Sequence, residues 1–387
     1  MERIRTTHAG SLPRPREITH SLVALARGDD VDRSELDFAI RGATRATIAK
    51  QIEAGLDIVN NGETGRESFF TYVRGRMTGF SGVSSRPLMQ DLARYPGYLE
   101  GSERARTTKA GTGINVLRPP QATGEVTYPD PNAIETELSE LRDLFAEAEL
   151  DPSRGFVSAP SPGIVAAAME NKFYESMADY ITALGKALAV EYRAILDAGF
   201  TLQIDAPDLA LERHTLFQDK PLGEFLAFSR LVVESLNANL ADAPRERVRL
   251  HVCWGNYEGP HDCDVALADI WDQIAGARVG GFMLSMANPR HAHEYRLFRD
   301  GILPAGAVLI AGAIDTTTNY VEHPETVADR LERVAEAVGD PARIMAGTDC
   351  GFETAAGYGK VNESIVWQKL ASLSAGAALA SKRLFAS

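Results

Sequence analysis

A histidine and two cysteines are the side chains in this sequence best suited to metal chemistry. His251 and Cys253 stand two residues apart in the run "RLHVCWGN", residues 249–256, and Cys350 lies in "GTDCGF". Alternate side chains of a strand share one face, so His251 and Cys253 would point the same way. Imidazole nitrogen and thiolate sulfur are preferred zinc ligands. The alternative is a core histidine beside a cysteine that packs as a small apolar side chain.

Short β-type runs alternate with long helical stretches along most of the chain. Eight such runs predict βαβ units, a parallel sheet and the strand number of a (β/α)8 TIM barrel, an α/β fold. An open doubly wound sheet is the alternative, but no G-x-G-x-x-G motif follows the first run. The expected strands are Arg3–His8, Leu56–Asn60, Gly155–Ala159, Phe200–Asp205, Val248–Cys253, Gly280–Leu284, Val308–Ala313 and Arg343–Gly347. The expected helices include Leu36–Ala54, Met177–Ala198, Leu222–Leu240 and Thr326–Val338.

One segment, Ser81–Pro131, interrupts this alternation. It is rich in glycine, proline and arginine, and a hairpin is expected near its "TGEVTYPDP". The segment follows the second expected strand and is too long for a bare connection, so we expect an insertion over the barrel mouth. Since the alternation continues on both sides, residues 1–387 are expected to form a single barrel domain.

Composition limits the class of protein. The 387 residues are 44% hydrophobic and 24% charged, which predicts a soluble globular protein. A net charge of -13 argues against a nucleic-acid surface, which requires a basic face. No apolar run could cross a bilayer and no secretory leader opens the sequence, so we expect a cytoplasmic protein. Three cysteines are too few for a disulfide framework.

The ends of the expected strands carry polar side chains. In (β/α)8 barrels, chemistry takes place at the carboxyl ends of the strands. Asn, Asp, Ser and Gly also serve as ordinary strand-to-helix connectors. That role does not explain His251, Cys253 and Cys350, and it explains Glu63 poorly. The polar residues at these ends are His8, Ser11, Asn60, Glu63, Ser158, Ser161, Asp205, Asp208, His251, Cys253, Asp349 and Cys350.

Three protein ligands with one open position describe a catalytic zinc site, whereas a structural site has four. We therefore expect His251, Cys253 and Cys350 to hold one zinc ion. A second His/Cys pair, "PHDCD", lies in a loop after Gly-Pro and is not expected to bind metal. The run "RHAHEY" lacks the spacing of a metal-binding helix, so its histidines are expected to be solvated or to support other ligands.

Several stretches together resemble the barrel of cobalamin-independent methionine synthases, most closely the short single-barrel members. They are "RTTHAGSLPRP", "VNNGE", "LQIDAPDLA", "HVCWG", "NPRHAHE", "VEHPE" and "AGTDCGF". The resemblance runs from Arg5 to the carboxyl terminus. It implies a (β/α)8 barrel whose zinc activates a substrate thiol for alkylation. His251, Cys253 and Cys350 match three of the family's metal ligands, and Ser11, Glu63 and Asp205 match the residues that hold its amino-acid substrate.

Two positions depart from the family's pattern. Ser285, in "MLSMANPRH", stands where the resemblance implies a glutamate ligand. Thr316, in "IDTTTN", stands at or near a histidine that is thought to protonate the leaving group. Two thiolates and an imidazole leave zinc formally neutral, so the missing glutamate would make the ion a stronger Lewis acid.

The leading prediction is a zinc-dependent alkyltransferase that acts on a small thiol and an alkyl donor. Addition of a thiol to an epoxide, as in the related epoxyalkane:coenzyme M transferases, is the alternative within this chemistry. An anionic thiol would then need a cation from Arg14, Arg66 or Arg290. A zinc hydrolase with Glu63 or Asp205 as base is less compatible with two sulfur ligands. A non-catalytic binding barrel is the last alternative, and an oligomer is possible.

Overall fold

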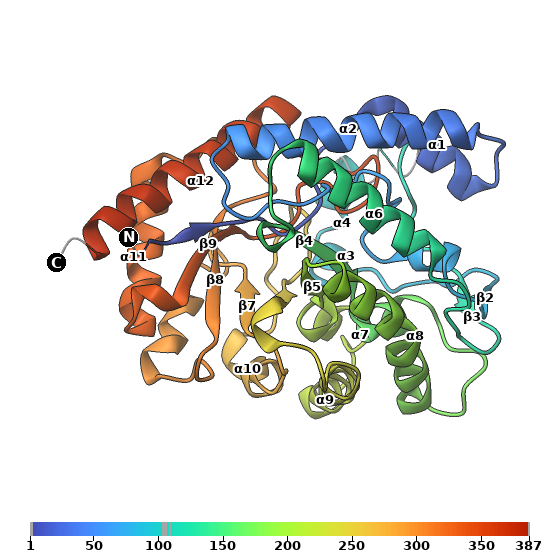
Figure 1. Cartoon of the computed structure of the whole chain (residues 1–387). Coiled ribbons are helices and arrows are strands. Elements are labelled where there is room, and N and C mark those ends of the chain that lie inside the picture. Colours follow the sequence, from blue (N-terminus) through green and yellow to red (C-terminus); the bar gives the residue numbers. More distant parts are fainter. Residues whose placement is uncertain (1–2, 103–106, 108–109, 386–387) are drawn as a thin grey trace.

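Seven parallel strands form one curled sheet that helices surround (Figure 1). The structure is a computed structural model that describes residues 3–102, 107 and 110–385. The strands are β1 Arg5–Thr6, β4 Phe156–Pro160, β5 Thr201–Asp205, β6 Val248–Val252, β7 Gly281–Leu284, β8 Val308–Ile314 and β9 Ile344–Thr348. Their order in the sheet is β1-β9-β8-β7-β6-β5-β4, and every neighbouring pair is parallel. The predicted α/β fold with a parallel sheet is confirmed.

The expected strand Leu56–Asn60 is the one run that forms no regular strand. In this segment only Val59 makes a bridge, to Gly155 beside β4. The side chain of Asp57 interferes with regular pairing, because its Oδ2 accepts the Thr6 backbone N–H at 2.9 Å. The other seven expected runs match observed strands to within two residues at either end.

The same segment nevertheless contacts both edges of the sheet. Ile58 N–H donates to the carbonyl of Thr6 in β1 at 3.1 Å. Val59 N–H donates to the carbonyl of Arg154, just before β4, at 3.0 Å. Residues 56–60 therefore lie between the two edge strands.

The strands are buried along almost their whole length. Every residue of β4, β6, β7 and β9 is buried. Sheets that are covered on both faces carry near-continuous apolar runs, as these strands do. The buried polar side chains of β6 have polar partners: Arg249 Nε–H donates to Gln203 Oε1 at 2.8 Å, and His251 Nδ1 lies 2.9 Å from Asp205 Oδ1.

The four expected helices are confirmed. Helix α2 begins after Asp32, whose side chain accepts Glu35 N–H, and α8 begins after Ser176, which caps Asp179 N–H. In the described part of the chain no helix is both long and apolar enough to cross a membrane. The helices are α1 Arg16–Arg27, α2 Arg33–Glu53, α3 Gln90–Arg94, α4 Pro96–Gly101, α6 Asn132–Glu147, α7 Pro162–Ala168, α8 Met177–Asp197, α9 Leu222–Asn239, α10 Leu267–Ala275, α11 Pro324–Val338 and α12 Glu363–Leu384.

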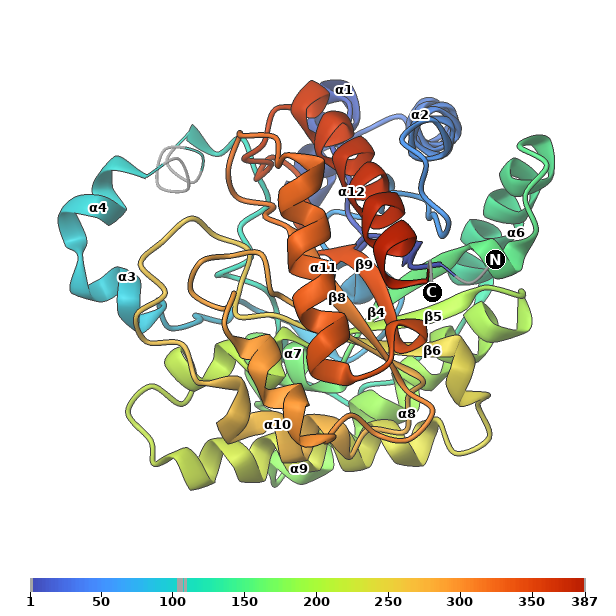
Figure 2. The same ribbon diagram turned by 90° about the vertical axis from the view of Figure 1, so that its left-hand side faces the viewer.

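The segment 81–131 carries α3 and α4, which lie to one side of the sheet in Figure 2. It packs against the loop that follows β6. Tyr95 OH donates to Asp262 at 3.0 Å, and Tyr98 OH donates to the carbonyl of Glu258. Residues 103–106 and 108–109 of this segment lie outside the described residues.

The hairpin expected near "TGEVTYPDP" is wrong. The antiparallel pair joins β2 Phe80–Ser81 to β3 Gln121–Ala122, so the start of the segment pairs with a stretch in its last third. Pro129 and Pro131 have no N–H to donate, which prevents a second strand within the motif itself. This pairing holds the segment at its base.

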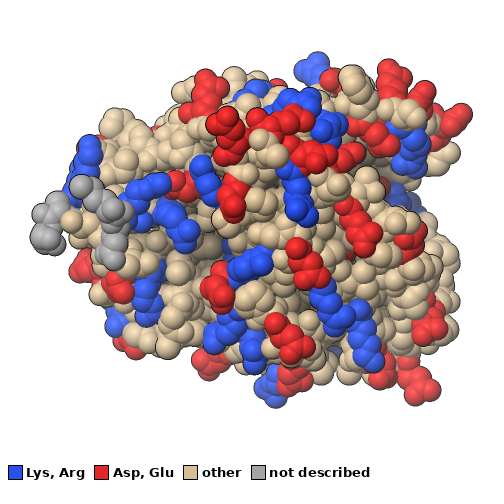
Figure 3. All heavy atoms as spheres, in the orientation of Figure 1, with Lys and Arg blue, Asp and Glu red and all other residues tan. Residues whose placement is uncertain are grey.

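Acidic and basic side chains are interspersed on the face shown in Figure 3. Ion pairs of this kind link α2 to α6, where Arg41 and Arg45 lie 3.1 and 2.7 Å from Glu147. Exposed pairs of this type contribute little to stability. We regard them as surface contacts between neighbouring helices.

Candidate metal centre

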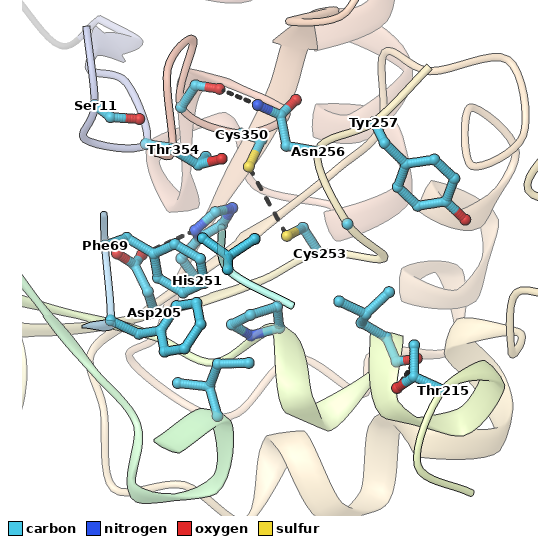
Figure 4. Close-up of a pocket in the computed structure, with 18 of the residues that line it drawn as sticks. Ser11, Phe69, Asp205, Thr215, His251, Cys253, Asn256, Tyr257, Cys350 and Thr354 are labelled. Carbon is cyan, nitrogen blue, oxygen red and sulfur yellow. Dashed lines mark hydrogen bonds and ion pairs between the residues drawn. The ribbon is translucent and has the colours of Figure 1, made fainter. Parts of the chain in front are cut away.

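The three expected metal ligands converge at one end of the sheet (Figure 4). His251 lies in β6, Cys253 follows that strand, and Cys350 lies two residues after the end of β9. One ligand atom from each lies within 4.8 Å of the others, and Cys253 Sγ is 3.9 Å from Cys350 Sγ. In the sheet, β7 and β8 separate β6 from β9. The curl of the sheet therefore brings the two sulfur atoms together.

Hydrogen bonds fix the orientation of His251. Its Nδ1 lies 2.9 Å from Asp205 Oδ1 in β5, and that oxygen also accepts Gln203 Nε2–H at 2.8 Å. Burial would lower the pKa of His251, but the hydrogen bond to Asp205 and the nearby Cys253 raise it to about 9. In metal sites a carboxylate on one imidazole nitrogen commonly orients the other nitrogen toward the metal. Here the other nitrogen, His251 Nε2, lies 3.2 Å from the carbonyl of Asp349.

The pKa values of the two thiols are shifted in opposite directions. A hydrogen bond from Cys350 lowers the pKa of Cys253 to about 6, although burial opposes this. The same hydrogen bond, together with burial, raises the pKa of Cys350 above its ordinary value. Two sulfurs and an imidazole, all buried, are a donor set that suits zinc.

The loops that carry the ligands are joined to one another. The Asp349 carboxylate accepts the backbone N–H groups of Met286, Ala287 and Asn288 at 2.8, 2.9 and 2.7 Å. Asn256 Nδ2–H donates to the carbonyl of Gly351 at 2.7 Å. The loops after β6, β7 and β9 are therefore held in fixed relative positions.

A cavity of about 100 Å³ opens beside the three ligands. It lies between the carboxyl ends of the strands and the segment 81–131. Most of the lining is apolar, which favours exclusion of water. The apolar lining includes Phe69, Phe70, Met89, Val116, Leu117 and Leu211, and the polar lining includes Ser11, Glu63, Asp205 and Thr215.

Glu63 presents an unsatisfied carboxylate to this cavity. It is 1% exposed; its Oε1 accepts Ser158 Oγ–H at 2.7 Å, and its Oε2 has no hydrogen-bond partner. Burial, with a contribution from Asp205, raises the pKa of Glu63 to about 7. Its φ of 56° is unusual for a residue with a side chain. A Cβ on Gly10 would lie 2.4 Å from Glu63 Oε1, so the close approach requires glycine.

The expected arginines do not line the cavity. Arg14 donates to the carbonyls of Glu353 and Glu63 at 2.6 and 2.9 Å. Arg66 pairs with Glu137 at 2.9 Å, and Arg290 is exposed. The arginine in the lining is Arg86, from the segment 81–131, which forms an ion pair with Glu212. Sequence reasoning missed Arg86, since no motif marks it.

The two departures from the family's pattern occupy defined positions. Ser285 Oγ–H donates to the carbonyl of Asp349 at 2.9 Å, next to Cys350. Thr316 Oγ1–H donates to Asn256 Oδ1 at 3.1 Å. Among the described residues, the grouped ligand atoms come from His251, Cys253 and Cys350, and the Asp205 carboxylate contacts His251 Nδ1 from outside this group.

Solved structures show the same fold. Over the whole of both chains, the structure resembles a B12-independent methionine synthase from Shewanella sp. W3-18-1, with a TM-score of 0.74 and 21% identity. It also resembles a putative vitamin-B12 independent methionine synthase from Listeria monocytogenes, with a TM-score of 0.62 and 17% identity. That match covers 97% of this chain and 98% of the other.

Sequence comparison extends the likeness. The chain is 26% identical over 387 residues to a methionine synthase from Thermococcus kodakarensis, covering 98% of this chain and 94% of the relative. It is 23% identical over 351 residues to one from Sulfolobus acidocaldarius, covering 90% and 85%. Residues 4–365 match the family described as "Cobalamin-independent synthase, Catalytic domain". Because that match spans most of the sequence, the chain belongs to the family of cobalamin-independent synthase catalytic domains.

Proposed function

We propose that this protein is a zinc-dependent alkyltransferase that methylates a small amino-acid thiol, in the manner of a methionine synthase. The observation that carries the proposal is the convergence of His251, Cys253 and Cys350 beside a largely apolar cavity. The relatives are named methionine synthases, which supports methyl transfer over addition to an epoxide. Two sulfur donors also fit thiol activation better than hydrolysis.

The proposed architecture is a single (β/α)8 barrel. Residues 56–60 would take the eighth strand position, because they hydrogen-bond to both edges of the seven-stranded sheet. Segment 81–131 would lie over the mouth, since Arg86, Met89, Val116 and Leu117 line the cavity. The residues 1–387 would then form one domain.

Each residue has a distinct part in this proposal. His251, Cys253 and Cys350 would hold zinc, which lowers the pKa of a bound thiol so that it reacts as a thiolate. Asp205 orients His251 through the 2.9 Å contact with Nδ1. Glu63 has a free carboxylate oxygen that could accept an ammonium group, and Ser11 lies in the same lining.

The test is metal analysis combined with a reaction panel. The purified protein should contain zinc and, with homocysteine, should form methionine from a methyl donor such as a methylated folate. The panel should include small epoxides as rival electrophiles. Zinc-loaded protein that alkylates no thiol with any donor would contradict the proposal.

Asp205→Asn is expected to weaken zinc binding by about tenfold, the lower end of the effect of a residue that supports a metal ligand. The loss is modest because the amide oxygen can still accept from His251 Nδ1, while the negative charge is gone. Competition with a chromophoric chelator measures the affinity. Asp208→Asn is the matched control: Asp208 accepts Ser161 Oγ–H and lies outside the three-ligand group. Equal affinities for the Asp205 variant and the wild type would contradict the role of Asp205.

Ser285→Glu is expected to weaken binding of the thiol substrate by about tenfold or more, which corresponds to about 1.4 kcal/mol. A carboxylate at this buried position would take the fourth ligand position or add negative charge that repels a thiolate. Calorimetry of thiol binding at neutral pH measures the affinity, and it also reports the protons that are released on binding. Ser285→Ala, which loses only the hydrogen bond to Asp349, should bind thiol like the wild type. Tighter thiol binding by the glutamate variant would refute an open fourth position.

A further inference from the structure

A second group of metal-type donors lies in the loops that follow β6 and β7. Ligand atoms of His261, Asp264 and His291 all lie within 4.8 Å of one another. Asp264 Oδ2 is 2.9 Å from His261 Nδ1 and 2.8 Å from His291 Nε2. The three side chains are 6%, 1% and 5% exposed. We propose that they bind a second divalent transition-metal ion, such as Zn²⁺, in a structural role.

The outer nitrogen of each imidazole faces an acceptor. His261 Nε2 lies 3.0 Å from the carbonyl of Tyr257. His291 Nδ1 makes no hydrogen bond, but Glu294 Oε1 lies 3.6 Å from it, at ion-pair distance. A neutral imidazole carries one N–H, so it cannot donate both to this acceptor and to Asp264. If the outer nitrogen keeps the proton, the inner lone pair is free for a metal. Histidine ligands have this arrangement, with the second nitrogen on a carbonyl or a carboxylate.

The buried carboxylates around the cluster also favour a bound cation. Three carboxylates lie around the cluster. Asp91 accepts Tyr257 O–H at 2.6 Å and His261 N–H at 2.9 Å, Asp264 contacts both histidines, and Glu294 lies 3.6 Å from His291. Within the described chain, none of these carboxylates pairs with lysine or arginine; the ion pairs of Asp264 and Glu294 are with histidine alone. Buried charges without partners are costly. A divalent ion at Asp264 supplies the missing charge.

Two further buried atoms point into the cluster without a hydrogen bond. His214 Nδ1 and Asp264 Oδ1 lie 3.2 Å apart, and each side chain is 1% exposed. Neither atom has a hydrogen-bond partner. Buried polar groups without partners are rare and call for an explanation. An ion bound by Asp264 would place positive charge beside these two atoms, although His214 lies outside the three-ligand group.

The second group of donors is connected to the candidate metal centre through Trp254. His261 has a φ of 52°, one of three positive values among the described non-glycine residues. Such conformations persist where the surroundings enforce them, often at ligand sites. The ring of His291 stacks on Trp254 at 3.9 Å, and Trp254 follows Cys253 directly. A metal here joins the loop that carries Cys253 to the loop after β7.

The donor set defines the class of ion. Two imidazole nitrogens and one carboxylate suit zinc and its neighbours in the first transition row. Magnesium and calcium prefer oxygen ligands, and the cluster has no sulfur donor for Cu(I). Zn²⁺ and Co²⁺ are therefore the probes to use.

Metal counting on the full chain tests the proposal. Protein freed of metal and reloaded with Zn²⁺ or Co²⁺ should bind two ions per chain. The Cys253→Ser/Cys350→Ser variant should bind one, and its Co²⁺ form should lack the sulfur-to-cobalt charge-transfer band. His261→Gln should also bind one ion and keep that band. His293→Gln, an exposed histidine near the cluster, is the matched control and should bind two.

The cysteine variant leaves the second cluster intact, so the test does not depend on whether the histidine variant folds. No bound ion in the cysteine variant, or an unchanged count in folded His261→Gln, would overturn the second site. If only the proposed site at His251, Cys253 and Cys350 is wrong, the wild-type protein should bind one ion, and its Co²⁺ form should lack the charge-transfer band.

Discussion

Cys350→Ser is expected to abolish zinc retention at the His251/Cys253 site, which removes one zinc ion per chain, and to reduce thiol methylation by a factor on the order of 10³ or more. At pH 7 a free thiol of pKa about 8.5 is only about 3% ionised, which accounts for about 30-fold. Loss of a fixed position for the sulfur accounts for about a further 100-fold. Zinc content and turnover under saturating thiol measure the two effects.

Cys263→Ser is the matched control for this prediction. Cys263 lies in the loop after β6, partly exposed, with its Sγ 3.6 Å from Asp262 and outside the three-ligand group. The control should keep both zinc and turnover. Full activity in the Cys350 variant would exclude Cys350 as a ligand and would remove the main support for the proposed function.

Glu63→Gln is expected to raise KM for an amino-acid thiol by about 30-fold, the equivalent of a charge-assisted hydrogen bond of about 2 kcal/mol. The physical reason is the loss of a buried negative charge whose Oε2 has no other partner. Turnover at saturation should change less, because Glu63 is not among the grouped metal ligands. Glu67→Gln, a neighbouring acid that pairs with Arg74 at 2.7 Å, is the matched control.

The pH dependence of thiol binding tests the role of Glu63 independently. Burial and the charge of Asp205 raise the pKa of Glu63 to about 7, so in the free enzyme the carboxyl is protonated below this pH and ionised above it. Affinity for an ammonium-bearing thiol should therefore rise as pH increases through about 7. The Glu63→Gln variant should lose this step. A thiol without an amino group should show no such step even with the wild type.

Much of the fold could be predicted from the sequence, because strand and helix periodicities are local. The prediction of a regular strand over residues 56–60 was wrong, since the Asp57 side chain takes the backbone N–H of Thr6 that regular strand pairing would use. The grouping of His251, Cys253 and Cys350 could be anticipated because parallel strands end on one rim. Their role as zinc ligands stays a prediction.

The positions of long or isolated polar side chains could not be predicted in the same way. Arg14 and Arg66 follow expected strands, yet their guanidinium groups turn to Glu353 and Glu137. Asp264 carries no motif spacing, and it meets His291 only because the loops after β6 and β7 fold toward each other. Such contacts depend on tertiary packing.

The proposed ligands also connect distant parts of the chain. Cys253 and Cys350 are 97 residues apart in sequence, and two other strands lie between theirs in the sheet. A chain in which this half of the sheet has opened would retain the ligands but lose their geometry, so the ion would bind the folded form preferentially. By mass action, free metal at 100 times its Kd would then stabilise that form by about 2.7 kcal/mol. Bound zinc would thus stabilise the folded form of the carboxyl-terminal half of the molecule, and the melting temperature would rise with the free zinc concentration.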